Sequence, residues 1–349
     1  MGLRQLKYRE AVAEATLQAM QRDPSVFVMG EGVDDTKGIF GTTRLAFEAF
    51  GRERVFDVPL SENSLTGWGT GAALMGLRPL MVHARNDFVL LAMDQIANHA
   101  AKWKYLNGSG VPWTMRAIIG RGWGQGAQHS QSLQATFAHF PGLKVVMPAS
   151  PYDAKGLLLS SIFDPSPVIV LEHRRLYEKA GHVPRRFYTV PLGRAKVLRE
   201  GGDVTIVALS DMVRESLRAI ESLAGSGIEI ELIDARTVRP LDAATIIRSV
   251  RKTGRLVVCD TSWVQFGVSA EISSRVCESA FRHLRAPIVR VGLPDCPTPC
   301  SYALEKVFYP DYLDIVKAVR KVLEPKKKKR LDSFRPRRIH EVDTFRGPF

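Results

Sequence analysis

Short apolar runs of strand length alternate with helical segments along most of the chain, and this alternation constrains the fold more than any other feature. In the first half, the segments that separate most of these runs are long enough for a helix, as parallel strands require. Sheets of parallel strands are covered by helices on both faces. The sequence therefore predicts an α/β domain with a parallel sheet, whose expected strands are residues 26–29, 55–58, 80–83, 113–119, 143–147 and 168–171.

Local signals place helices between these strands. The dipeptide Ser150-Pro151 supplies an N-cap followed by proline at the first helical position. Ser61 is a good N-cap for a helix that contains three glycines, which are costly in a helix interior. Such glycines predict a close approach by backbone or by a ligand. The expected helices are residues 8–21, 62–73 and 88–105, and one that begins at Pro151.

A second β/α series follows a charged segment that contains Pro184, lacks periodicity and is interpreted as a linker. This series predicts a second parallel-sheet domain. Its expected strands are 204–209, 228–233, 256–259 and 288–291, with helices between them and a last helix over 311–323. The predicted organisation is a first domain over 1–175, the linker over 176–191, a second domain over 192–324 and a basic tail over 325–349.

The tail concentrates the positive charge of the chain, which has 349 residues and a net charge of +13. Residues 325–349 hold nine Lys or Arg against three acidic residues and have almost no apolar periodicity. We expect a solvated extension that is disordered in part, and docking onto an acidic partner or a polyanion is the functional alternative. No aromatic and basic binding module accompanies the run, so nucleic-acid binding is not expected.

The cysteine content and the lengths of the apolar runs indicate in which cellular compartment the protein is expected. Four cysteines in a chain of this length predict a reducing environment rather than a disulfide framework, and no Cys or His spacing predicts a metal site. The N-terminus does not resemble a secretory signal, and no apolar run approaches the roughly 20 residues of a membrane span. A cytoplasmic protein that makes no contact with a membrane is expected.

Unusual residues stand where ligands bind in open parallel sheets, at the carboxyl ends of the strands. Glu62 opens a helix, where a carboxylate can simply saturate free N–H groups. His129 lies in a polar, glycine-rich loop and can be a structural histidine. No nucleophile elbow, dinucleotide fingerprint or Walker loop is present. The residues alone therefore predict a two-domain α/β enzyme with a carboxylate and a histidine at one sheet edge, and leave the roles of both open.

At these positions the chain resembles the β subunits of pyruvate, branched-chain 2-oxo acid and acetoin dehydrogenases, in the transketolase-like superfamily. The resemblance runs from about Tyr8 to Leu323 and rests on many motifs in the same order. In the first half they are Phe56-Asp57-Val58-Pro59-Leu60-Ser61-Glu62, Gly76-Leu77-Arg78-Pro79, Met93-Asp94-Gln95-Ile96, Gln128-His129-Ser130-Gln131, Pro141-Gly142-Leu143-Lys144-Val145-Val146 and Tyr152-Asp153-Ala154-Lys155-Gly156-Leu157. In the second half they are Asp234-Ala235-Arg236-Thr237-Val238-Arg239-Pro240-Leu241-Asp242 and Gln265-Phe266-Gly267-Val268.

The resemblance implies a thiamine-diphosphate site and a role for each matching residue. Glu62 matches the carboxylate that faces the ring nitrogen N1′ of the aminopyrimidine. A proton shared there favours the imino tautomer of the cofactor, whose exocyclic nitrogen can then take the C2 proton. Phe88 matches the aromatic residue packed on the pyrimidine, and His129 matches the histidine near the thiazolium and the incoming lipoyl group. Gln95 is expected among the cofactor-binding residues.

The resemblance also implies what the chain lacks. Superfamily members hold the Mg²⁺ of the diphosphate with a Gly-Asp-Gly motif and a later asparagine, and no Gly-Asp-Gly occurs here. A separate α subunit is therefore expected to supply these ligands, in a heterotetramer of two α and two β subunits. Some relatives also hold a monovalent cation such as potassium, and the matching positions are Trp113, Ser161, Ile162, Asp164 and Ser166.

The implied function is decarboxylation of a 2-oxo acid, pyruvate or a branched-chain acid, with transfer of the acyl group to the lipoyl group of a dihydrolipoyl acyltransferase. An acetoin dehydrogenase β subunit and a non-catalytic scaffold of the same fold are the alternatives. The sequence departs from the family in its polar segment Ala84-Arg85-Asn86-Asp87 and in the bulky Trp68 and Trp123. Trp68 is expected either to narrow the substrate pocket or to fill the core.

Overall fold

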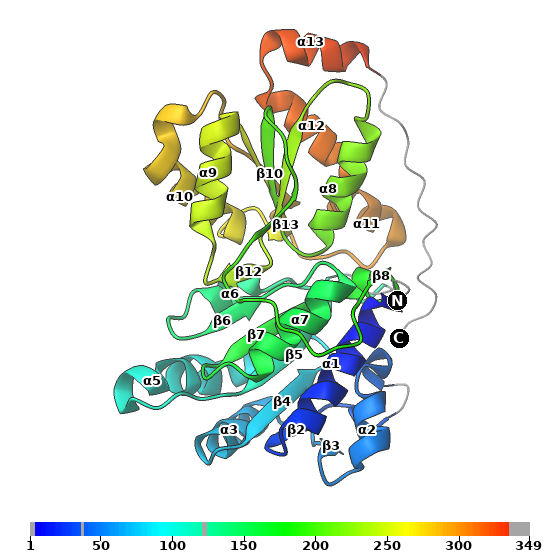
Figure 1. The fold of residues 1–349 in the computed structure, drawn as a ribbon, viewed down its shortest axis with the longest axis vertical. Helices are drawn as coiled ribbons and strands as arrows, with labels where there is room; N and C mark the ends of the chain where they lie inside the picture. Colours follow the sequence, from blue (N-terminus) through cyan, green and yellow to red (C-terminus); the bar gives the residue numbers. More distant parts are fainter. Residues whose placement is uncertain (1–3, 36–37, 121–123, 335–349) are drawn as a thin grey trace. The chain divides into compact units, whose positions relative to one another are not determined.

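A computed structural model describes residues 4–35, 38–120 and 124–334 (Figure 1). The chain forms two compact units. The first comprises the residues up to Leu192 together with Thr237–Pro240, and the second comprises Gly193–Arg236 and the residues from Leu241 onward. Each unit has its own sheet, so the prediction of two α/β domains is confirmed.

The sheet of the first unit has seven strands in the order β12-β6-β7-β5-β4-β2-β3. The strands are β2 (Val26–Gly30), β3 (Val55–Asp57), β4 (Arg78–His83), β5 (Thr114–Ile119), β6 (Lys144–Val146), β7 (Val168–His173) and β12 (Thr237–Arg239). Six of them are parallel, and β12 pairs antiparallel with β6 at one edge. Every residue of β2, β5 and β7 is buried, as expected for strands covered on both faces.

The helices of the first unit include those expected and two others, over residues 44–50 and 134–138, that were not predicted. They are α1 (Tyr8–Arg22), α2 (Arg44–Phe50), α3 (Glu62–Leu74), α4 (Asn86–Val89), α5 (Ala101–Asn107), α6 (Gln134–Ala138) and α7 (Pro151–Ile162). The side chain of Ser150 accepts a hydrogen bond from the backbone N–H of Asp153 and so caps α7. Short helical turns are η1 (Gly38–Gly41) and η4 (Arg174–Leu176).

The helix expected over 88–105 follows one helical path, but its hydrogen bonding changes along the way. After α4 come a 3₁₀ turn, η2 (Leu90–Ala92), and a π-helical segment, η3 (Asp94–Ala100), before α5. The backbone is right-handed helical at each junction, at Leu90, Met93 and Ala101. π-Helical segments are rare and recur at functional sites. The sequence cannot show this change, because the apolar spacing of an α-helix and of a π-helical turn differ too little over seven residues.

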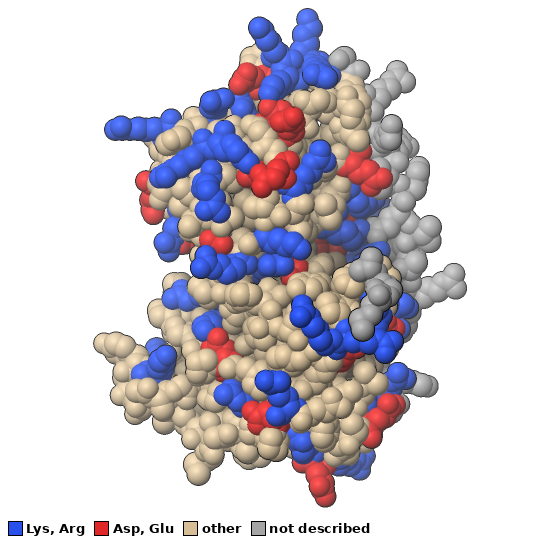
Figure 2. All heavy atoms as spheres, in the orientation of Figure 1, with Lys and Arg blue, Asp and Glu red and all other residues tan. Residues whose placement is uncertain are grey.

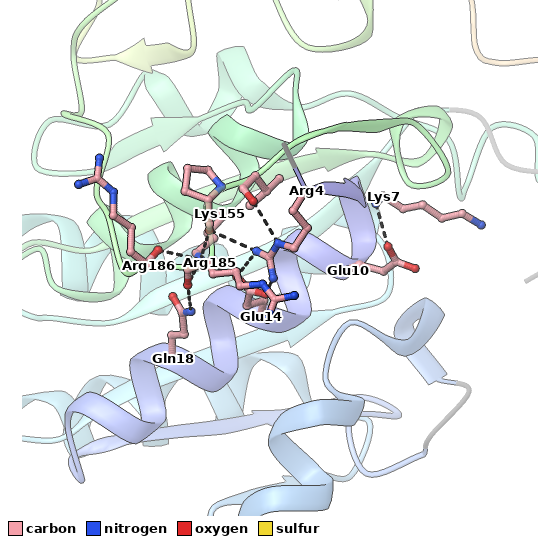
Figure 3. A network of polar contacts seen from close by, with 10 residues as sticks. Arg4, Lys7, Glu10, Glu14, Gln18, Lys155, Arg185 and Arg186 are labelled. Atoms are coloured by element: carbon pink, nitrogen blue, oxygen red, sulfur yellow. Dashed lines mark hydrogen bonds and ion pairs between the residues drawn. The ribbon is translucent and has the colours of Figure 1, made fainter. Parts of the chain in front are cut away.

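A polar network joins the supposed linker to the first unit (Figure 3). The ammonium of Lys155, on α7, donates hydrogen bonds to Glu14 on α1 and to the backbone carbonyls of Pro184, Arg185 and Arg186. Strand β8 (Ala180–His182) pairs with β1 (Gln5–Lys7). The segment over 176–191 is therefore packed on the first unit along its length.

The second unit has a five-stranded sheet in the order β14-β13-β10-β11-β9. Its strands are β9 (Lys196–Arg199), β10 (Val204–Ala208), β11 (Ile230–Asp234), β13 (Leu256–Trp263) and β14 (Val289–Leu293). The edge strand β9 pairs antiparallel with β11, and the other pairs are parallel. The helices are α8 (Asp211–Ser222), α9 (Ala243–Thr253), α10 (Val268–Ala280), α11 (Tyr302–Phe308), α12 (Tyr312–Val322) and α13 (Pro325–Ser333), with a short turn η5 (Phe281–His283).

The expectation of disorder from residue 325 is wrong for the first part of the tail. Residues Pro325–Ser333 form helix α13, with proline in its first turn. Leu331 is buried, and the ammonium of Lys327 pairs with Asp203, which explains why this charged segment is ordered. Figure 2 shows Lys and Arg side chains gathered around α13 and over the neighbouring helices of the second unit. Residues 335–349 lie outside the described part of the chain.

The expectations about membrane-spanning segments and about the cysteines can be compared with the structure. No helix in the described ranges is long and apolar enough to cross a membrane. All four cysteines are free: Cys259 is buried, and Cys277, Cys296 and Cys300 are exposed. Burial raises the pKa of the Cys259 thiol to about 12, so this side chain is a packing residue and not a nucleophile.

Candidate active site

The predicted site residues come from the carboxyl ends of three strands of one parallel sheet. Glu62 follows β3, Phe88 follows β4 and His129 follows β5. In the sheet, β4 lies next to β5, and only β2 separates β4 from β3. Because the carboxyl ends of parallel strands meet at one edge, the fold brings these three loops to the edge where ligands bind.

Glu62 is the first residue of α3 and is 8% exposed. Its carboxylate accepts no hydrogen bond from any residue that the structure describes, and Ser61 makes no side-chain cap. Simple saturation of the free N–H groups of α3, one of the two roles left open, is therefore not what the carboxylate does here. Burial of the residue and the lack of a hydrogen-bond partner among the described residues leave the carboxylate available to a ligand.

Two of the glycines in α3 are explained by close packing within the chain. A Cβ atom on Gly67 would lie 3.1 Å from Oε1 of Gln95, and one on Gly69 would lie 2.7 Å from the sulfur of Met81. The helix can therefore approach η3 and β4 only because these positions have no side chain. Gly71 faces open space, so nothing in the described chain explains it.

The rings of Phe88 and His129 contact each other edge to face, with centroids 5.3 Å apart and an interplanar angle of 86°. This contact joins two residues that are far apart in the sequence and were predicted to share a site. Edge-to-face packing is a favoured geometry for aromatic pairs, because the positive ring edge meets the negative ring face.

Gln95 lies on the π-helical segment η3, which packs against α3. Its side-chain carbonyl lies beside Gly67 of α3, and its amide donates a hydrogen bond of 3.2 Å to Asp94. The contacts of Gln95 therefore fix the packing of α3 against η3. A cofactor-binding role for this residue stays a prediction.

A small cavity lies between α3 and the ends of β2 and β4, and it was not anticipated from the sequence. Its volume is about 10 Å³, of the order that holds one water molecule, and Leu65 of α3 and Val58 line it. Glu31 and His83 line it as well, with Oε1 and Nδ1 3.6 Å apart and without a hydrogen-bond partner among the described residues. The sequence signal that could have indicated this cavity is a glutamate and a histidine, Glu31 and His83, at the ends of two buried strands.

The five residues matched to a cation site come together where α7 ends and β7 begins. The backbone N–H of Asp164 donates to Ser161, and the N–H of Ser166 donates to the Asp164 carboxylate. The guanidinium of Arg78 donates to the carbonyls of Ile162 and Asp164, and Lys144 donates to the Asp164 carboxylate. The backbone carbonyl of Trp113 accepts a hydrogen bond from the backbone N–H of Val168 nearby. Two cationic side chains thus already use oxygens of this set, and a bound potassium ion stays a prediction.

The structure also answers the question about Trp68. Trp68 is 54% exposed and packs edge-on against Phe27 and Phe56, so it does not fill the core. Trp123 lies outside the described residues. Within residues 4–35, 38–120 and 124–334, no group of three or more His, Cys, Asp or Glu side chains is placed to hold a metal ion.

Comparison with protein families agrees with this architecture. Residues 4–179 match the transketolase pyrimidine-binding domain, and residues 193–315 match the transketolase C-terminal domain. Among solved structures, a chain described as split gene transketolase, inactive beta4 tetramer, superposes with a TM-score of 0.73 at 25% identity, covering 91% of this chain and 98% of that one.

Named relatives are similar over nearly their whole length. The pyruvate dehydrogenase E1 component subunit beta of Rickettsia felis is 43% identical over 91% of this chain and 98% of its own. The acetoin:2,6-dichlorophenolindophenol oxidoreductase subunit beta of Cupriavidus necator is 42% identical over 92% of this chain and 98% of its own. The mitochondrial pyruvate dehydrogenase E1 component subunit beta-1 of Arabidopsis thaliana is 43% identical over 92% of this chain and 90% of its own. This chain therefore belongs to the transketolase-like family that contains the β subunits of pyruvate dehydrogenase E1 and acetoin dehydrogenase.

Proposed function

We propose that this chain is the β subunit of a thiamine-diphosphate-dependent 2-oxo acid dehydrogenase, active only with an α subunit. The pair decarboxylates a 2-oxo acid and transfers the acyl group to the lipoyl group of a dihydrolipoyl acyltransferase. The observation that carries the proposal is the buried carboxylate of Glu62, which has no partner in the described chain and opens α3 at the sheet edge that also holds Phe88 and His129.

The residues present fit one half of the cofactor. An aminopyrimidine offers a basic ring nitrogen and an aromatic face, and the edge offers a buried carboxyl group and a phenyl ring. Glu62 would share a proton with that nitrogen, and Phe88 would pack against the ring. When bound, thiamine diphosphate supplies the electron sink that loss of carbon dioxide from a 2-oxo acid requires.

His129 has a separate role in the proposal. Its imidazole rests on Phe88 and so lies beside the ring that would cover the pyrimidine. Histidine exchanges protons near neutral pH, which suits it to protonating and deprotonating the reacting groups during acyl transfer. The role of Glu62 is thus cofactor activation, and the role of His129 is the later transfer step.

The other half of the cofactor needs a partner chain. The diphosphate and its Mg²⁺ require oxygen ligands, and the sequence contains no Gly-Asp-Gly motif. The solved relative described as an inactive β4 tetramer is a case in which a chain of this fold, assembled only with itself, has no activity. We therefore propose that an α subunit supplies these ligands and that the complete assembly is a heterotetramer of two α and two β subunits.

Relatives named for acetoin and for pyruvate match this chain equally well, so an acetoin-cleaving β subunit is the second candidate. The same residues would serve both reactions. A non-catalytic scaffold of the same fold is disfavoured, because Glu62, Phe88 and His129 are all retained and the two rings are in contact.

The test is co-expression with a candidate α subunit, followed by an artificial-acceptor assay with pyruvate, branched-chain 2-oxo acids and acetoin. Activity that requires the co-purified pair, thiamine diphosphate and Mg²⁺ supports the proposal and identifies the substrate. The variant Glu62→Gln keeps the size of the side chain but cannot share its proton, so turnover should fall by roughly 10²–10⁴-fold while the assembly stays intact. Near-normal turnover by this variant would refute the assignment of Glu62.

A further inference from the structure

The polar segment after β4 contacts the loop that carries His129. We propose that Arg85, Asn86 and Asp87, here called the β4 clamp, are positioning residues that hold His129 against Phe88. The inference rests on the proposed function, because the role of His129 in acyl transfer is part of it. Each residue of the clamp makes a different kind of contact, and together they bind both ends of the loop.

Asp87 holds the far end of the loop. Its Oδ1 atom accepts hydrogen bonds from the backbone N–H of Gln131, at 3.2 Å, and from the side-chain amide of the same residue, at 2.9 Å. Hydrogen bonds to a carboxylate are stronger than neutral ones, and two bonds to one residue also fix its orientation. Asp87 immediately precedes Phe88, and Gln131 is two residues after His129, so this contact is close in sequence to both rings.

Asn86 uses both groups of its amide on the same segment. Its nitrogen donates to the carbonyl of Gln131 at 3.0 Å, and its oxygen accepts from the N–H of Leu133 at 3.0 Å. The side chain of Asn86 is fully buried, so loss of either bond would leave a polar group of its amide unsatisfied. An amide carries its donor and its acceptor on separate atoms, which suits asparagine to this position.

Arg85 holds the near end. Its buried guanidinium donates to the carbonyl of Gly120 at 3.0 Å and to the side chain of Gln125. The backbone N–H of Gly120 in turn donates to the carbonyl of Gln131 at 3.4 Å, which draws the two ends of the loop together. The β4 clamp therefore contacts the loop on both sides of His129, at Gly120 and Gln125 before it and at Gln131 and Leu133 after it.

The clamp acts on the Phe88–His129 pair and not on Glu62. Both rings lie within two residues of the Asp87–Gln131 contact, whereas Glu62 lies on a separate helix packed against η3 and β4. Loss of the clamp should thus displace the imidazole while leaving the activating carboxylate in place. A displacement of about 1 Å can lower a rate by roughly a hundredfold.

The test uses the α/β complex with thiamine diphosphate and Mg²⁺, and measures two steps separately. Exchange of the C2 proton of the bound cofactor reports on Glu62, and transfer of the acyl group to a lipoyl domain reports on His129. In Asp87→Ala we expect transfer to fall by roughly tenfold to a hundredfold, with C2 exchange within about twofold of wild type. Asp87→Asn keeps an acceptor oxygen toward Gln131, but it replaces the oxygen that accepts from the amide of Asn86 by a donor, so it should recover only part of the loss. Glu48→Ala, which removes an exposed carboxylate on α2, is the matched control.

A double-mutant cycle ties the effect to the contact. Gln131→Ala removes the side-chain bond to Asp87 but keeps the backbone one, so it should lower transfer less than Asp87→Ala does. Because both act through the same contact, the double variant should lower transfer no further than Asp87→Ala alone. If His129→Ala abolishes transfer but Asp87→Ala leaves transfer unchanged, the clamp is overturned and the role of His129 stands. Unchanged transfer in His129→Ala would instead overturn the proposed role of His129. An equal fall in transfer and C2 exchange would show general damage to the site and would also overturn the clamp.

Discussion

The imidazole of His129 and the ring of Phe88 meet edge to face, with their centroids 5.3 Å apart. The histidine belongs to a loop after β5 and the phenylalanine to the first helical turn after β4. Their contact shows how a parallel sheet assembles a site from short loops after neighbouring strands. Because the rings are in contact, a substitution of either residue also changes the packing of the other.

Replacement of Phe88 by leucine should weaken binding of the cofactor more than it slows chemistry. The variant keeps an apolar side chain but loses the aromatic ring that would cover the pyrimidine, and with it the edge-to-face contact to His129. An aromatic contact is worth about 0.5–1.5 kcal/mol. We expect the dissociation constant of thiamine diphosphate to rise by roughly 2-fold to 12-fold in the α/β complex. Calorimetric titration measures it, and an unchanged constant would mean that Phe88 does not contact the cofactor.

The edge at which this pair lies could be predicted from the sequence, because it depends on local signals. Strands such as β2 and β7 are short apolar runs that are buried on both faces, and their order along the chain implies a parallel sheet. The carboxyl ends of the strands, and hence the places of Glu62, Phe88 and His129, follow from that order.

Other features depend on contacts between distant segments and could not be predicted. Strand β12 lay within an expected loop, because three residues on a sheet edge give no periodic signal. The glycines of α3 were recognised as unusual, but only the structure shows that Gln95 and Met81 fill the space beside them. The β4 clamp likewise joins residues 35 to 47 positions apart through polar contacts, and the sequence showed only that the segment is unusually polar.

Arg116 and Glu172 form a buried ion pair between β5 and β7, and separating the two residues should destabilise the first unit. Both side chains are 1% exposed, and Glu172 also accepts a hydrogen bond from Tyr177. Arg116→Met leaves a carboxylate buried without its partner, which should lower the free energy of unfolding by about 3–5 kcal/mol. The double variant R116M/E172L should lose less, because no charge remains buried. Urea unfolding of the two variants measures the difference, and equal losses would contradict this account.

The pair of Glu14 and Lys155 should make stability depend on acid pH. Burial by itself raises the pKa of Glu14, but hydrogen bonds from Arg4 and Lys155 outweigh it and hold the pKa below the ordinary value of 4.5. The ionised carboxylate therefore contributes stability above about pH 4.5, and the contribution is lost as the pH falls through the lower pKa of the folded state. Lys155, whose pKa is lowered chiefly by burial, stays protonated over this acid range.

The variant Glu14→Gln tests this dependence. At pH 7 it should unfold with a free energy lower by about 1.5–3 kcal/mol, because hydrogen bonds to a charged group are lost. The difference from wild type should shrink as the pH is lowered below 4.5. Urea unfolding across the pH range gives the comparison, with the exposed Glu48→Gln as the control. A difference that is constant with pH would show that the ionisation of Glu14 does not stabilise the fold.

Helix α13 should be a folded part of the second unit, although its sequence contains a run of four lysines and an arginine. Leu331 is buried, Lys327 pairs with Asp203, and Asp332 pairs with Arg320 of α12, so the helix is attached along its length. Leu331→Ala should remove most of the apolar attachment, worth about 1.5–3 kcal/mol, and release the helix without unfolding the sheet. Hydrogen exchange should then be fast at the amides of α13 and unchanged in β10 and β13. Substitution of the exposed Lys328 by alanine, as a control, should leave both unchanged. Rapid exchange of α13 in the wild-type chain would show that the charged segment is not held by Leu331, because a helix of nine residues is too short to be stable alone.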